Sequence, residues 1–215
     1  LCADIARTGD AQDKYNKIQE RDNILEQIQQ AKEYQSVFEG MTNSVTKWQN
    51  GSTPSITSGG YCFLNQWGSA RYNTATQFLA LVYDKHNYGK ADKFSEWAKG
   101  QMDYLLGDNP NDKCYVVGLE DYSVKYPHHR ASSGLSKCED TSEQKHVLYG
   151  ALVGGPGAND EHIDTTADYI YNEVTIDYNA AFVGASAGLY ALFGDSSMLP
   201  DKDFPPAEQT SDDEN

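Results

Sequence analysis

The spacing of apolar residues predicts helices in four stretches of the chain. A thin apolar stripe runs through residues 1–38, with a break at residues 8–10. Stronger helical spacing follows over residues 66–83, 91–106 and 178–193, and Gly or Asn stands where the first two of these should end. Hardly any stretch is typical of a strand. The pattern therefore predicts an all-α protein.

Within two of the predicted helices, the apolar positions identify the face that should point inward. For the helix over residues 66–83 they are Ala70, Phe78, Leu79 and Val82. For the helix over residues 91–106 they are Phe94, Trp97, Ala98, Met102 and Leu105. We expect these two helices to pack as a hairpin joined by a short turn.

Long loops separate the helices. Residues 50–60 are dense in Gly, Ser, Thr and Pro, a composition typical of loops. The segment over residues 108–140 is longer than a simple connection between helices in a compact domain. Loops of this length are usually functional or disordered. The run Tyr115–Val117 predicts a short strand there, which favours function over disorder. The acidic, proline-broken residues 199–215 predict an unstructured tail.

Charge and ring content narrow the classes of partner. Thirty-two acidic residues against seventeen basic ones give a net charge of −15, so we expect no nucleic-acid partner and no binding to an anionic membrane. No apolar run approaches the ~20 residues that a bilayer crossing requires. Fifteen Tyr, seven Phe and three Trp suit a ligand with apolar faces and polar edges, such as a sugar, although we expect most of these rings in the core.

The four cysteines occur without the Cys-x-x-Cys spacing of zinc and redox sites. An even count permits disulfides. A bond between Cys114 and Cys138 would staple the segment between them and stabilise the fold by roughly 3.5 kcal/mol. Such a bond is typical of secreted proteins, but sequence leaves the pairing open.

The stretch ADYIYNEVTIDYNAAFVGASAGLY holds the strongest candidate for chemistry. Its Glu173 stands between tyrosines and directly before an apolar helix, so we expect its carboxyl group to be partly desolvated. Desolvation and the nearby Asp164, Asp168 and Asp177 would all favour the protonated form that a general acid needs. A helix-capping or calcium-binding acidic loop would explain the same residues without catalysis.

This stretch closely resembles the active-site signature of glycoside hydrolase family 9, the cellulase family. The matching positions are Asp164, Tyr169, Glu173, Thr175, Asn179 and Ala180. The resemblance implies that Glu173 is the catalytic acid and that Asp164 is catalytic with it. His162 stands where the signature has an aromatic residue, a departure that bears on local packing.

Two further blocks resemble family segments that bind the sugar. In YVVGLEDYSVKYPHHR, the resemblance implies that His128 and Arg130 hold the sugar near the cleaved bond with hydrogen-bond donors. In GGYCFLNQWGSARYNTATQFLALVY, it implies that Trp67 stacks on a glucose ring while Arg71 binds hydroxyls or orients a carboxylate. The four-residue spacing would put this pair on one helix face. Tyr178 also matches a family subsite residue.

The first of these two blocks departs from the family pattern at Cys114, Glu120 and Tyr122. We therefore expect the backbone of its loop to differ from that of the family. A bond between Cys114 and Cys138 would replace part of the loop's usual support.

Together the blocks imply that residues 1–198 are the carboxyl-terminal part of a family 9 catalytic domain and that residues 199–215 are a flexible tail or linker. The implied fold is part of an (α/α)6 barrel with long functional loops. The implied activity is inverting hydrolysis of β-1,4-glucosidic bonds in cellulose or related β-glucans, by a secreted enzyme that requires no cofactor. The oxygen ligands of the acidic segment GANDEHIDTTAD are compatible with a structural calcium ion.

Inverting hydrolysis needs a base opposite the acid. The family's base is an Asp in a DAGD-like motif of the amino-terminal half, and no such motif occurs in this chain. The chain also opens within a helical pattern. We therefore expect the amino-terminal half of the same domain to be its partner.

Two other functions remain open from the residues. A half-barrel could be a non-catalytic carbohydrate-binding module, although it would expose the apolar faces of its helices. A calcium-binding structural domain could form around GANDEHIDTTAD, which is rich in oxygen ligands but lacks EF-hand spacing.

Overall fold

The computed structural model describes residues 16–26, 29, 40, 47, 55–86, 94–137, 139 and 142–195. The chain forms two compact units, Leu1–Asn43 and Ser44–Asn215. In the first unit residues 16–26 are helical, which confirms that part of the helix predicted over residues 1–38. The tail at residues 199–215 and the side chain of Cys138 lie outside the described residues.

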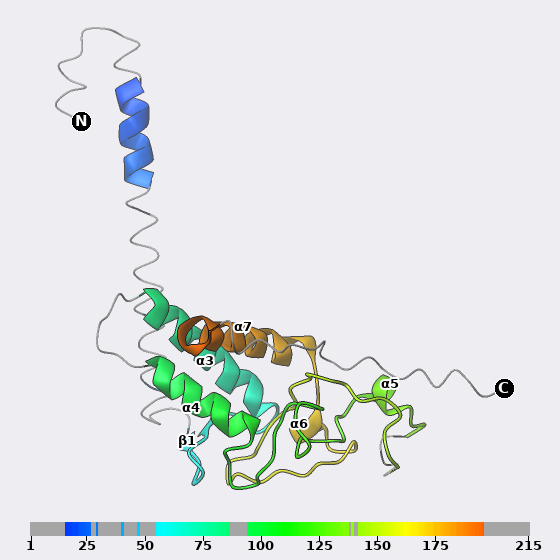
Figure 1. Ribbon diagram of the computed structural model, residues 1–215. Helices are drawn as coiled ribbons and strands as arrows, with labels where there is room; N and C mark the ends of the chain where they lie inside the picture. Colours follow the sequence, from blue (N-terminus) through cyan, green and yellow to red (C-terminus); the bar gives the residue numbers. More distant parts are fainter. Residues whose placement is uncertain are drawn as a thin grey trace. The chain divides into compact units, whose positions relative to one another are not determined.

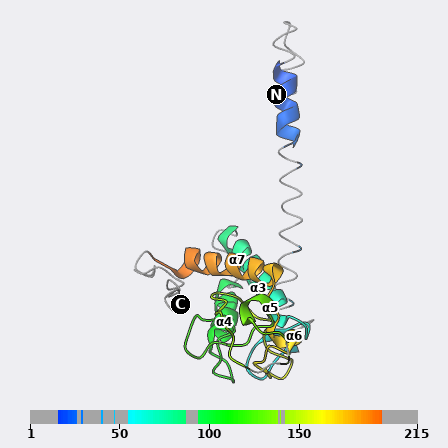
Figure 2. The same ribbon diagram turned by 90° about the vertical axis from the view of Figure 1, so that its right-hand side faces the viewer.

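Three long helices pack together in the second unit: α3 (Ser69–His86), α4 (Phe94–Leu106) and α7 (Ile176–Phe193). Figures 1 and 2 show them grouped, with long loops to one side. These loops contain the short helices α5 (Arg130–Ser133) and α6 (Tyr169–Asn172). The all-α prediction is confirmed.

The strands in the described residues are a single antiparallel hairpin of β1 (Ser55–Ile56) and β2 (Cys62–Phe63). It lies in and directly after the predicted loop over residues 50–60. None of the helices in this part of the chain combines the length and apolar character needed to cross a membrane.

The starts of α3 and α7 differ from the predicted ones for identifiable reasons. Helix α3 begins three residues late, because Gly68 has a left-handed φ of 66° and interrupts the helical backbone. Helix α7 begins two residues early, because Thr175 caps it and accepts a hydrogen bond from the Tyr178 amide. Both differences bear on the candidate site, since Trp67 precedes α3 and Glu173 precedes α7.

The predicted inward face of α4 is confirmed. Phe94, Ala98, Met102 and Leu105 are each at most 5% exposed. Trp97 is partly buried against the same apolar cluster. The 3.6-residue period of this helix therefore identified its core residues.

The predicted inward face of α3 is only partly right. Ala70 is fully buried, but Phe78 is 40% exposed, while the amides of Asn73 and Gln77 are fully buried. An apolar period cannot reveal a helix face that buries amides. Such a face is stable when the amides have hydrogen-bond partners.

A buried amide network provides partners for Asn73 and for the Gln77 amide nitrogen, but not for Gln77 Oε1, and ties α3 to α4 and β2. The Asn73 side-chain amide donates to the Cys62 carbonyl oxygen at 3.0 Å and to Gln101 Oε1 at 2.8 Å. Gln77 donates to Asn73 Oδ1 at 2.6 Å, and Gln101 donates to the Gly60 carbonyl oxygen at 2.9 Å. The network fixes the hairpin against the helices from which the site is built.

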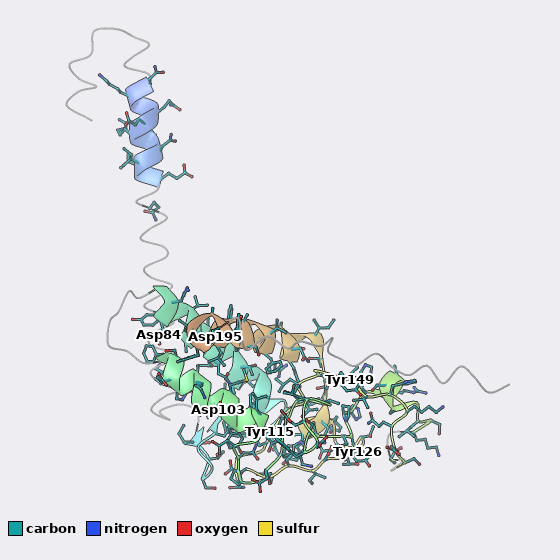
Figure 3. All side chains as sticks on the ribbon, viewed as in Figure 1. Asp84, Asp103, Tyr115, Tyr126, Tyr149 and Asp195 are labelled. Atoms are coloured by element: carbon teal, nitrogen blue, oxygen red, sulfur yellow. The ribbon has the colours of Figure 1, made fainter. Side chains whose placement is uncertain are left out.

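The strand predicted at Tyr115–Val117 is wrong. Val116 forms one isolated bridge with Leu152, and the Tyr115 amide instead donates to the Leu105 carbonyl oxygen at the end of α4. The three residues are buried all the same, and Figure 3 shows Tyr115 where the loops meet α4. The segment is apolar because it lies in the hydrophobic core. Its backbone groups form hydrogen bonds with several neighbouring segments and not with one partner strand.

The disulfide expected between Cys114 and Cys138 is also wrong. Cys114 is a free thiol, fully buried in the apolar cluster around Tyr115, and its sulfur lies 3.7 Å from the Val116 carbonyl oxygen. Burial raises the pKa of this thiol. The loop is therefore held by core packing at this position.

Asp160 is a buried carboxylate that joins the hairpin, α4 and the loop before Glu173. It is 4% exposed and accepts hydrogen bonds from Thr57, Ser58, the Gly59 amide and the Tyr104 hydroxyl, at 2.5 to 2.8 Å. Burial acts to raise the pKa of Asp160, but the four donors outweigh it and hold the pKa below its ordinary value.

His162 packs as an aromatic ring. It meets Tyr115 edge to face at a centroid distance of 4.9 Å and lies 5.9 Å from the Tyr171 ring. Burial lowers the pKa of His162 to about 4, so the ring is neutral near pH 7. A neutral imidazole thus takes the place of the aromatic residue of the signature.

Helix α7 exposes much apolar surface. It buries only Tyr178 and Ala185 fully, whereas Ile176 is 91% and Val183 63% exposed. A helix that is apolar on all sides is normally buried. This surface is therefore suited to contact with further protein.

The Asp160→Asn substitution is expected to lower the free energy of unfolding by about 2–3 kcal/mol near pH 7, because the amide replaces a charged acceptor of four hydrogen bonds. The folded-state pKa is depressed, so the stabilisation is complete above the unfolded pKa of about 3.9 and is lost as the pH falls through the folded value. Urea denaturation at a series of pH values from 7 to 2 measures this loss of stability. The exposed Asp121→Asn serves as control, and equal stability of the two variants would contradict the role.

The His162→Phe substitution is expected to remove a pH dependence of stability. Between about pH 6.5 and 4 the unfolded chain binds a proton at His162 that the folded chain does not, so acid destabilises the wild type by at most about 3 kcal/mol from this group. As the pH falls through this window, the stability of the variant should rise relative to that of the wild type. Above the window the difference in stability should stay constant. Thermal melts at pH 7.5 and 4.5 test this, and a constant difference between the proteins would refute it.

Candidate active site

Glu173 lies at the junction of two helices, each with a side-chain cap. Asp168 caps α6 and accepts from the amides of Ile170 and Tyr171, and Thr175 caps α7. Glu173 between them has an extended backbone. The caps fix both ends of a very short connection and thereby limit where its side chain can lie.

One oxygen of Glu173 receives two hydrogen bonds. Trp67 Nε1 donates to Glu173 Oε2 at 2.7 Å, and the Tyr178 hydroxyl donates to the same oxygen at 3.0 Å. Within the described part of the chain, Oε1 receives none. The indole of Trp67 is 49% exposed, whereas Tyr178 is 1% exposed.

These side chains line a pocket of about 470 Å³. Its lining residues are Asn65, Trp67, Arg71, Tyr72, Glu173, Thr175, Asp177 and Tyr178. The structure thus brings together four of the seven predicted site residues from segments about a hundred positions apart.

Arg71 is fixed within this pocket. Its guanidinium forms an ion pair with Asp177 at 3.1 Å and donates to the Tyr72 hydroxyl at 2.9 Å. It lies 4.9 Å from the centre of the Tyr178 ring. The hydrogen bonds from Thr175 and Arg71 hold the pKa of Asp177 below its ordinary value. The prediction that Trp67 and Arg71 share one helix face is wrong, because Trp67 lies before α3 begins.

His128 lies beside Glu173 through its backbone. Its amide donates to the Asn172 carbonyl oxygen at 2.7 Å, and it forms a single parallel bridge with Glu173. The ring Nδ1 is 2.5 Å from the Thr166 carbonyl oxygen, so Nδ1 carries a hydrogen and donates it to that oxygen. The ring also contacts Tyr169, which in turn contacts Trp67.

Arg130 is the first residue of α5 and is exposed. It stands two residues after His128, but it does not line the pocket of Glu173. Within the described residues its guanidinium has no ion pair.

Asp164 lies away from this pocket. Its carboxylate accepts from the amides of Lys125 and Tyr126 at 3.0 to 3.2 Å and lies 3.8 Å from Lys113 Nζ. It therefore holds the backbone directly before Pro127 and His128.

The three aspartates expected to act on Glu173 each have other partners. Asp164 binds the loop, Asp168 caps α6 and Asp177 pairs with Arg71. Among the described residues, no group of three His, Cys, Asp or Glu side chains is arranged to hold a metal ion.

Sequence reasoning missed Tyr72 and the pairing of Asp177 with Arg71. Asp177 stands in the first turn of α7, where a carboxylate is explained by the helix dipole. Nothing in the spacing of residues 71 and 177 reveals that the two side chains meet. The signal is purely tertiary.

Known proteins are similar to this chain in sequence and in fold. The family model described as glycosyl hydrolase family 9 matches residues 4–186. Endoglucanase A of Bacillus pumilus is 46% identical over 171 residues, which cover 76% of this chain and 26% of the relative. The chain thus spans about a quarter of the length of the curated relatives it matches.

Solved structures agree with the sequence comparison. The catalytic domain of Clostridium thermocellum CelT matches with a TM-score of 0.74 and 62% identity, covering 79% of this chain and 34% of that one. Endoglucanase CelQ from Clostridium thermocellum, complexed with cellobiose and cellotriose, matches with a TM-score of 0.63 and 44% identity, covering 72% and 26%.

All seven predicted site residues fall within the stretch that matches the family. The helices and loops described above are accordingly part of an (α/α)6 barrel, as the resemblance implied. The chain belongs to glycosyl hydrolase family 9.

Proposed function

We propose that the enzyme containing this chain hydrolyses β-1,4-glucosidic bonds of cellulose or a related β-glucan with inversion, and that Glu173 is its general acid. The observation that carries the proposal is the pocket in which the Glu173 carboxyl group meets a half-exposed indole and a fixed guanidinium. Rings and planar donors of this kind suit a sugar. The matched relatives named as endoglucanases support the same substrate class.

The proposed reaction is a single displacement. The Glu173 carboxyl group gives its proton to the glycosidic oxygen while the bond from that oxygen to the anomeric carbon breaks, so the leaving sugar departs as an alcohol. A water molecule attacks the anomeric carbon from the opposite face. Its proton passes to a base, which we assign to an Asp of the amino-terminal part of the domain.

The other site residues take distinct roles in this proposal. Trp67 offers its exposed ring face to a glucose unit, and Arg71 adds hydrogen-bond donors beside it. The buried Tyr178 belongs to this subsite through its hydrogen bond to Glu173. His128 and Arg130 bind hydroxyls near the cleaved bond. Asp164 acts as a positioning residue, because its hydrogen bonds hold the backbone that leads to His128.

The pockets next to that of Glu173 support the proposal that the substrate is a polysaccharide chain. One of about 380 Å³ shares Thr175 with it and is lined on its other side by Tyr149. Tyr149 also lines a pocket of about 490 Å³ together with Tyr126, and Figure 3 shows both tyrosines in the loop region. A run of hollows suits a chain-like ligand better than a single sugar.

We also propose the arrangement of the whole domain. Residues 1–198 form its carboxyl-terminal part and residues 199–215 a tail or linker, and the protein is secreted and uses no catalytic cofactor. The exposed apolar residues of α7, such as Ile176 and Val183, support packing against the amino-terminal half.

The Glu173→Gln substitution in the complete enzyme is expected to lower kcat on a soluble cellulosic substrate by 100-fold or more, an order set by general acid catalysis. Glutamine keeps the shape but has no acidic proton. An activated aryl glycoside should lose less, because its leaving group needs little protonation. Reducing-sugar release and aryl-group release measure the two.

The matched control is Glu96→Gln, on the exposed side of α4, which should keep wild-type rates. Near-normal turnover by Glu173→Gln with an unchanged melting temperature would exclude Glu173 as the acid.

The 215-residue chain expressed by itself is expected to show no more than trace hydrolysis and to associate in solution. It lacks the DAGD-like motif that would supply the base opposite Glu173, and burial of exposed apolar surface is worth about 25 cal/mol per Å². Light scattering and reducing-sugar release, with and without the separately expressed amino-terminal half, test both points. Robust hydrolysis by a monodisperse monomer would require a base within this chain.

A further inference from the structure

Both hydrogen bonds to the Glu173 carboxyl group are made to the same one of its two oxygens. A carboxyl oxygen has two lone pairs, and both donors, Trp67 Nε1 and the Tyr178 hydroxyl, point at Oε2. A proton on Oε2 would have to displace one of them. Oε1 is therefore the oxygen that is free to carry the acidic proton.

Tyr178 is placed to hold Glu173 and has little surface to offer a sugar. It is 1% exposed, so its ring face is unavailable for stacking. Its pKa is raised by burial and then by the hydrogen bond to Glu173, so the phenol remains a donor throughout the neutral range.

Gly68 makes the contact of Tyr178 with Glu173 sterically possible. A methyl group at position 68 would overlap the Tyr178 hydroxyl, and the left-handed φ of 66° is one that other residues rarely adopt. Gly68 follows Trp67 directly, so one short turn both delivers the indole donor and leaves space for the phenol donor.

Arg71 also contacts the ring of Tyr178. Its guanidinium lies 4.9 Å from the ring centre and is held by Asp177 at 3.1 Å. A cation over the ring makes the phenol hydroxyl a stronger donor. The Tyr178 side chain thus contacts both Gly68 and Arg71.

We propose that Trp67, Gly68, Arg71 and Tyr178 form a clamp that binds Glu173 Oε2, so that Oε1 is the oxygen that protonates the glycosidic bond. The proposal rests on the assignment of Glu173 as the general acid and adds the atom that acts. It makes Tyr178 and Arg71 positioning residues of the acid. It also gives Trp67 two roles, a ring face for the sugar and an N–H for the carboxyl group.

The clamp has a measurable effect on proton affinity. Donors to Oε2 stabilise the carboxylate more than the neutral acid. Removing one donor should therefore make the acid hold its proton to higher pH, and the alkaline limb of kcat/KM, which follows the protonated acid in the free enzyme, should move upward.

The test is the Tyr178→Phe substitution in the complete enzyme, with kcat and KM measured from pH 4 to 9 on a soluble β-glucan. We expect the alkaline limb to rise by about 0.5–1 pH unit, kcat at the optimum to fall about 10-fold, and KM to stay within about twofold. Tyr190→Phe, on the same helix and three turns away, is the matched control and should keep the wild-type profile.

Two further variants, Trp67→Phe and Gly68→Ala, test the clamp independently in case Tyr178→Phe does not fold. Trp67→Phe should move the limb in the same direction, and Gly68→Ala should move it as far as Tyr178→Phe. The combination of Gly68→Ala with Tyr178→Phe should move it no further, because both break one hydrogen bond. Thermal melting of each variant identifies losses that come from unfolding.

Alkaline limbs that stay at the wild-type pH in folded Tyr178→Phe and Trp67→Phe would overturn the clamp, whichever way KM moves. Glu173→Gln in the same series separates this result from failure of the proposed function. Loss of activity in Glu173→Gln beside unmoved limbs rejects the clamp alone, whereas retained activity in Glu173→Gln rejects the acid itself.

Discussion

The buried charge of Asp160 is the constraint on which the arrangement of this molecule depends. A carboxylate that is 4% exposed is stable only with several strong donors, and its donors come from the β1–β2 hairpin and from α4. Satisfying one charge therefore brings together parts of the chain a hundred residues apart. The segment that begins at Asp160 passes through α6 and ends at Glu173, so the same interaction anchors the part of the chain that carries the candidate acid.

The helices and the loops have separate tasks in this arrangement. The helices α3, α4 and α7 pack by apolar contact and by the amide network of Asn73, Gln77 and Gln101. The proposed site residues lie at the starts of α3, α5 and α7 and in the loops beside them. Helices are rigid, and a side-chain cap fixes the point where the chain enters each of them. Loop side chains next to such helix starts can therefore be held in the geometry that hydrogen bonds to a reacting group require.

The carboxylates show how environment assigns function to one chemical group. Asp160 is buried and serves as an anchor, Asp164 holds backbone amides, and Asp177 neutralises Arg71. Glu173 alone among these four combines a pocket with an oxygen that has no donor among the described residues. The net charge of −15 therefore does not indicate where the candidate acid lies, because the other three of these four carboxylates are engaged in the fold.

By itself, the sequence determined the three long helices, the inward face of α4 and the identity of Glu173 and its companions as family positions, because apolar period and motif spacing are local properties. It did not predict the short helices α5 and α6. It did not reveal the buried amides of α3, the free Cys114 thiol or the break at Gly68 that separates Trp67 from its expected helix face. Nor could it show that Asp164 faces the loop of His128 while Arg71 faces Tyr178. These pairings were decided by the tertiary structure, because they join side chains about forty to a hundred residues apart whose approach depends on packing and on no periodicity along the chain.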